Sequence, residues 1–250
     1  MHIDYKVPYW VKFQWDLSNH HDNQYVTEFN KQNNDVFLNF QHENQYIITV
    51  KFRIKRNYKT DKICMVFGKP GKNIGLSYNR ETGVLAFEYW TKKLNDESEH
   101  DLFHFLTFNY LKIEEIENGV TVSIVRDGNK FILYNNFEKV NLERFKTDLI
   151  DDYKKSGLFL GCSNTGTMVP EHRYYGEMDI DYFCVLNNTC EIEEAKDLFH
   201  TETDKILNKT YYNDILCLYD FKTINNLGIV YDESKYTHFL EKVPQNFILE

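Results

Sequence analysis

Short segments in which apolar and polar residues alternate make up much of the chain. Tyr46–Arg53 alternates along its length, which is the pattern of a β-strand with one buried face. The two sets are Ile47, Thr49 and Lys51 against Ile48, Val50 and Phe52. The segment therefore predicts a strand that packs one face on a hydrophobic core.

Turn signals join similar segments into hairpins. Val120–Arg126 and Lys130–Tyr134 flank Asp127-Gly128-Asn129, and Asp-Gly favours the tight turns that need positive φ. Ile74–Tyr78 and Val84–Trp90 flank a polar turn that ends in glycine. Many short strands at regular spacing, with few helices, predict a β-sandwich or a barrel.

One segment after residue 187 has a helical pattern instead. Asn188 or Thr189 is able to cap it, and Glu193 and Glu194 fall in its first turns, where the helix dipole favours acids. Its apolar stripe is Ile192, Ala195 or Lys196, Phe199 and Ile206. We expect this helix to pack over the edge of the sandwich.

The chain shows no Pro/Ser-rich linker and no internal repeat. We therefore expect a single domain over residues 1–250, since sandwiches of this length often form one unit. Its core is expected at about 40–206, with a closing strand and a tail over 207–250.

Composition supports an all-β domain and narrows the function. Aromatic residues make up 16% of the chain, and their side chains fit pleated, half-buried surfaces. The net charge of −9 argues against nucleic-acid and anionic-membrane binding, which need clustered Lys and Arg. The five cysteines lack a C-x-x-C spacing, which argues against a zinc ribbon. Free thiols are expected, although the spacing also fits a Cys184–Cys190 bridge.

The sequence shows neither a membrane-spanning run nor an ordinary signal peptide. No apolar run approaches the roughly 18 residues of a membrane span. The first residues lack the basic and apolar regions of an ordinary signal peptide. We expect the protein to be cytoplasmic or delivered as part of a larger assembly.

Three segments carry a family resemblance. They are Gly119–Gly128, a strand that ends in Asp-Gly; Gly157–Gly161, a strand that ends in glycine; and Tyr175–Asn187, followed by the Glu-rich helix. In this order they resemble the laminin-G-like (LamG) branch of the concanavalin A-like lectin/glucanase superfamily, over roughly residues 40 to 206. The resemblance implies an all-β jelly-roll sandwich of two antiparallel sheets. The superfamily includes lectins, adhesion modules, glycoside hydrolases and polysaccharide lyases, so function must be argued from the site.

The strand at Gly176–Leu186 is acidic on one predicted face. Alternation places Met178, Ile180, Tyr182 and Cys184 on one side and Glu177, Asp179 and Asp181 on the other. Carboxylates two residues apart on a strand lie roughly 6–7 Å from each other and repel. The face is then a solvated edge, a metal site or a catalytic site.

The resemblance gives the last two alternatives their residues. Several family members place a structural Ca²⁺ against this strand, which makes Asp179 the candidate metal ligand. The glucanase branch takes its nucleophile and acid from such a strand, which makes Glu177 and Asp181, with Asp179 between them, the catalytic candidates. A retaining glycosidase needs its two carboxyl groups about 5–5.5 Å apart, and the shorter Asp181 departs from the usual Glu.

Sugar sites pair an aromatic platform with planar polar side chains, and such residues occur at the end of one predicted strand and around the loop before the acidic strand. The candidate ligand-binding residues are Tyr89, Trp90, Asn164, His172, Arg173, Tyr175 and Glu177. Loops on a rigid scaffold are where binding residues concentrate. The first hypothesis is a non-catalytic, lectin-like module for a glycan or polysaccharide, within a larger surface or polysaccharide-processing protein. The alternatives are a polysaccharide-degrading enzyme and an assembly module that binds a partner domain or a second copy.

Overall fold

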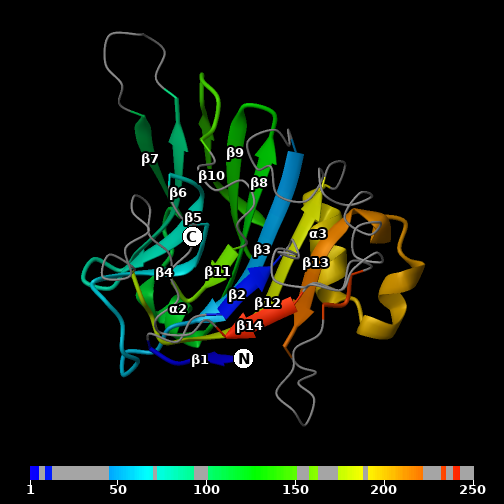
Figure 1. Cartoon of the computed structure of the whole chain (residues 1–250), viewed down its shortest axis with the longest axis horizontal. Coiled ribbons are helices and arrows are strands. Elements are labelled where there is room, and N and C mark those ends of the chain that lie inside the picture. The colour runs from blue at the N-terminus through cyan, green and yellow to red at the C-terminus, as the bar shows by residue number, and fades with distance from the viewer. Residues whose placement is uncertain are drawn as a thin grey trace, which may run out of the picture.

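The computed structural model describes residues 1–5, 9–12, 45–69, 72–92, 101–150, 158–162, 174–187, 191–221, 232–234 and 239–242. These residues form two seven-stranded antiparallel sheets that pack face to face (Figure 1). The predicted all-β sandwich is therefore confirmed. No helix among the described residues is long and apolar enough to cross a membrane.

The first sheet has the order β1-β12-β3-β8-β9-β10, and β13 pairs with β12 beside this path. Its strands are β1 (His2–Ile3), β3 (Gln45–Arg53), β8 (Val120–Asp127), β9 (Lys130–Asn135), β10 (Glu138–Arg144), β12 (Met178–Asn187) and β13 (Ile215–Asp220). The second sheet has the order β14-β2-β11-β4-β5-β6-β7. Its strands are β2 (Tyr9–Lys12), β4 (Ile63–Gly68), β5 (Gly75–Asn79), β6 (Val84–Thr91), β7 (Leu102–Thr107), β11 (Leu158–Leu160) and β14 (Phe239–Lys242).

Alternation along the strands builds the core between the sheets. From β3, the set Ile48, Val50 and Phe52 points inward, and β6 contributes Phe87 and Tyr89 from the opposite sheet. The hairpin between β8 and β9 is also confirmed, because Gly128 takes a φ of 60° at its turn. The described cysteines are buried, at positions 64, 162, 184 and 217, and Cys190 lies outside the described residues.

A β-bulge interrupts the alternation of β12. Ile180 pairs with Phe52 and Tyr182 pairs with Lys51, so Asp181 is an extra residue without a partner on β3. Side chains after the bulge change face. Met178 and Ile180 point into the sandwich core together with Phe183 and Val185, whereas Tyr182, Cys184 and Leu186 join a second cluster on the outside of the sheet. The predicted single face of Met178, Ile180, Tyr182 and Cys184 was therefore wrong beyond the bulge.

The predicted helix covers this second cluster. Helix α3 (Ile192–His200) is capped by Glu191, whose side chain and that of Glu194 satisfy each other's backbone N–H groups, so neither Asn188 nor Thr189 is the cap. Ala195 and Leu198 pack on the outer face of the first sheet, not on its edge. Ile206 joins them from the short helix η3 (Thr203–Asn208). The remaining helices are α2 (Ile113–Asn118) and η4 (Tyr212–Asp214).

Candidate functional site

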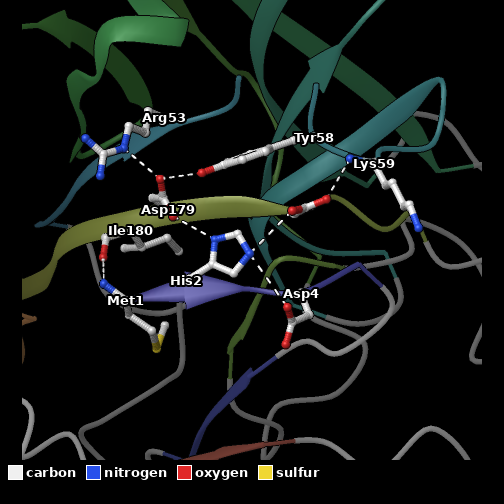
Figure 2. Close-up of polar contacts among 9 residues, drawn as sticks. Met1, His2, Asp4, Arg53, Tyr58, Lys59, Asp179 and Ile180 are labelled. Atoms are coloured by element: carbon white, nitrogen blue, oxygen red, sulfur yellow. Dashed lines mark hydrogen bonds and ion pairs between the residues drawn. The ribbon is translucent and has the colours of Figure 1, made fainter. Parts of the chain in front are cut away.

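Asp179 lies at the centre of a polar cluster on the outer face of the first sheet (Figure 2). It pairs with Arg53 on one side and with His2 on the other in the strand register. Arg53 Nε and the Tyr58 hydroxyl each donate to Asp179 Oδ2 at 2.7 Å, and His2 Nδ1 lies 2.7 Å from Oδ1. Both carboxylate oxygens are therefore bound by side chains of this chain.

These partners control the charge of Asp179. Burial raises the pKa of Asp179, but hydrogen bonds from Arg53, His2 and Tyr58 together outweigh burial and lower the pKa from 3.8 to about 2. Burial and the bond to Asp179 raise the pKa of Tyr58 to about 12. Asp179 is thus an anion at neutral pH, paired with the Arg53 guanidinium.

The geometry around Asp179 can be compared with the metal and catalytic hypotheses. No cluster of three or more acidic, His or Cys side chains suited to a metal is found in the described part of the chain. Glu177 Oε2 accepts the Lys59 amide at 2.8 Å, and Glu177 Oε1 lies 3.4 Å from His2 Nε2. Asp181 sits at the bulge, so the three carboxylates do not form the regular row that the sequence suggests. Calcium at Asp179 and catalysis by Glu177 and Asp181 stay predictions.

The predicted sugar-binding residues are separated by the structure. Asn164, His172 and Arg173 lie outside the described residues. Tyr175 is buried edge-on against Tyr5, and its backbone amide donates to Asp61. Tyr89 has no exposed surface, because its ring stacks on His104 at 4.6 Å within the core. Neither tyrosine offers a ring face to a ligand in this conformation.

Trp90, in contrast, lies on the outer face of the second sheet beside two exposed rings. It pairs with Phe103 of β7, and the two ring centroids are 5.1 Å apart. Phe103 and Phe105 are 46% and 48% exposed. We call Trp90, Phe103 and Phe105 the aromatic face. It lies where β6 and β7 run side by side at the edge of the sheet (Figure 1).

Charged and polar side chains border the aromatic face. Lys72 Nζ lies 2.6 Å from Asp101 Oδ2 and 5.9 Å from the centroid of the Trp90 ring. Glu88 points to the same side of β6 as Trp90, since the residue between them faces the core. Sequence reasoning missed Phe103, Phe105 and Glu88. The signal was available in Leu102–Thr107, where apolar residues on both sides of a strand cannot all reach one core.

The sequence matches no family model and no curated protein. Among solved structures it is similar to a Bacteroides ovatus protein proposed to bind carbohydrate, at 12% identity and a TM-score of 0.54. That match covers 100% of this chain and 61% of the other. The CBM40 module of a Ruminococcus gnavus IT-sialidase matches at 11% identity and a TM-score of 0.47, over 79% of this chain and 95% of that one.

A further similarity involves the binding domain of botulinum neurotoxin DC, solved in complex with SialylT, at 14% identity and a TM-score of 0.41. It covers 65% of this chain and 36% of the toxin domain, so the chain spans less than two thirds of the Bacteroides and toxin structures. The likeness to the Bacteroides protein and the two packed antiparallel sheets show that this chain has the concanavalin A-like lectin fold.

Proposed function

We propose that this chain is a non-catalytic, laminin-G-like glycan-binding module and that the aromatic face holds the sugar. The observation that carries the proposal is the pair of half-exposed rings, Phe103 and Phe105, next to Trp90. Sugar rings have an apolar C–H side that packs on aromatic rings, and their hydroxyls need polar groups at the rim. The Lys72–Asp101 pair supplies such groups.

The distribution of exposed apolar side chains supports this surface. Of the seven exposed large apolar side chains among the described residues, three belong to β7, and two of these, Phe103 and Phe105, lie on the same side of the strand. Contiguous apolar surface on a folded protein commonly marks a binding site. The fold agrees, because the Bacteroides protein with the same fold is itself proposed to bind carbohydrate.

A glycan array of the folded protein tests the proposal. We expect selective binding to one glycan class, and we expect the Phe103→Ala, Phe105→Ala double variant to bind roughly tenfold or more weakly. Leu207→Ala is the matched control, because Leu207 is an exposed apolar residue on η3, away from β7. An empty array, or full binding by the double variant, would overturn the proposal.

One observation favours an assembly module as the second candidate. β7 ends the second sheet, and its sequence LFHFLT has no Lys, Pro or acidic residue to discourage pairing with another strand. This candidate predicts a mass that rises with concentration in analytical ultracentrifugation and returns to the monomer in the Phe103→Ala, Phe105→Ala variant. A concentration-independent monomer would remove it.

A further inference from the structure

Glu88 is a buried carboxylate that forms no ion pair with any residue that the structure describes. It is 6% exposed, and its partners in the strand register are Gly75 and Phe105, which offer no polar side chain. Burial raises the pKa of Glu88, and a hydrogen bond from the Ser77 hydroxyl opposes this in part. Among the described residues, no Lys, Arg or His forms an ion pair with it. A carboxylate accepts about four hydrogen bonds, so most of its capacity is unused.

Trp90 carries the complementary group. Its indole Nε1–H is buried and meets no acceptor in the part of the chain that the structure describes. Glu88 and Trp90 are two residues apart on β6 and share its outer side, which puts their backbones about 6–7 Å apart. One unused donor and one underused acceptor therefore lie on the same side of one strand.

Such groups are costly in a folded protein. A buried polar group without a partner loses the hydrogen bonds that water gave it, and native structures keep few such groups. Here the unpartnered Trp90 N–H and the underused Glu88 carboxylate lie beside the half-exposed rings of Phe103 and Phe105, which line the neighbouring strand. A ligand that brings hydroxyl groups into this position would satisfy the donor and the acceptor and cover the rings at the same time.

We propose that Glu88 and the Trp90 indole recognise two hydroxyl groups of an uncharged sugar ring, one donating to the Glu88 carboxylate and one accepting from Trp90 Nε1. The inference rests on the proposed glycan binding and names its ligand class. An uncharged sugar is selected because a buried carboxylate without a cation repels a carboxylated or sulfated ring. Lys72 does not reverse this selection, since Asp101 already neutralises it.

The test uses the full chain against neutral gluco-, galacto-, manno- and xylo-oligosaccharides and against sialylated and sulfated forms of the same cores. We expect the parent protein to prefer a neutral oligosaccharide, and Glu88→Gln to weaken that binding roughly tenfold. Trp90→Phe keeps an aromatic ring but lacks the N–H, so it should also weaken binding and remove a ligand-induced change in tryptophan fluorescence. Glu138→Gln is the matched control, because Glu138 is exposed on β10 of the other sheet.

The outcomes separate this inference from the proposed function. If the parent binds no glycan, the proposed function fails and the inference fails with it. If the parent binds a neutral sugar through Phe103 and Phe105 but Glu88→Gln and Trp90→Phe bind equally well, the inference is overturned and the function stands. A preference for sialylated or sulfated glycans overturns the inference in the same way. Should Glu88→Gln fail to fold, Trp90→Phe decides alone.

Discussion

Two buried carboxylates, one on each sheet, meet opposite surroundings. Asp179 is 8% exposed and Glu88 is 6% exposed, so little of either residue meets solvent. The pKa of Asp179 falls to about 2, whereas the pKa of Glu88 rises. Burial raises the pKa of Glu88, and its strand neighbours, a glycine and a phenylalanine, do not oppose this, whereas Asp179 lies between Arg53 and His2, which bind its carboxylate.

This contrast separates a structural residue from a candidate ligand-binding residue. The carboxylate of Asp179 receives three side-chain hydrogen bonds and joins β1, β3 and the loop that carries Tyr58. The carboxylate of Glu88 has a hydrogen bond from the Ser77 hydroxyl, which lowers its pKa in part. A buried acid whose oxygens are both bound within the chain stabilises the fold, and one with few partners has capacity for a ligand.

Breaking the ion pair should give the largest effect on stability. Arg53→Met leaves the Asp179 carboxylate without its cation, and we expect the free energy of unfolding at pH 7 to fall by about 2 kcal/mol. The loss stays below that of a fully buried pair because the Arg53 side chain is 39% exposed. Urea unfolding measures it, and an unchanged midpoint and slope would show that the pair is only a surface contact.

The second-largest effect is expected from acid, which should remove the contribution of Asp179 to the free energy of unfolding. Because the folded-state pKa of Asp179 is about 2, below its ordinary 3.8, its stabilisation is complete above pH 4 and is lost as pH falls toward 2. We expect the parent to lose about 1–2 kcal/mol more than Asp179→Asn over this interval. Urea unfolding at several pH values provides the curve, and parallel curves for the two proteins would contradict the assignment.

Removing one hydrogen bond should have a smaller effect. Tyr58→Phe deletes the hydroxyl that donates to Asp179 Oδ2, and we expect a loss of about 1 kcal/mol. The same change should raise the pKa of Asp179, which NMR titration of the side-chain carboxyl carbon detects. Tyr174→Phe is the control, because Tyr174 is 37% exposed. Equal losses for the two variants would mean that the hydroxyl bond adds nothing.

Glu88→Gln should give the smallest change in stability, with the opposite sign. The raised folded-state pKa means that the stability contribution of Glu88 is present below its ordinary pKa of 4.5 and is lost as pH rises through the folded-state value. At pH 8 the glutamine variant should therefore be more stable than the parent, by up to about 1 kcal/mol. Thermal unfolding at pH 4 and pH 8 measures this, and a less stable variant at pH 8 would reveal a cation that pairs with Glu88.

Local pattern predicted the strands well because their information is local. The alternation in β3 and the Asp127-Gly128 turn each need only neighbouring residues to be read. The site was harder to predict, because its partners are distant. Arg53 and His2 are 126 and 177 positions from Asp179. The pattern of Leu102–Thr107 indicates that some of its apolar side chains lie outside the core, but it does not show which ones, or that β7 is the last strand of its sheet.

The predicted helix start and the predicted faces of β12 were wrong for a related reason. Glu191 is an unusual cap, and it serves here because Glu194 completes a reciprocal pair. The offset at Asp181 arises from the pairing with β3, where Ile180 and Tyr182 meet the adjacent residues Phe52 and Lys51. A period of two read along β12 alone gives no sign of it.

Because of the bulge, the presence of a residue at position 181 matters more for the fold than which residue it is. Replacing Asp181 keeps the offset, so natural variants with another residue there should retain both apolar clusters. Deleting it would turn Phe183 and Val185 toward α3 and bring Tyr182 and Cys184 into the sandwich interior. Among related chains, this strand should therefore tolerate substitution at 181 and exclude deletions at that point.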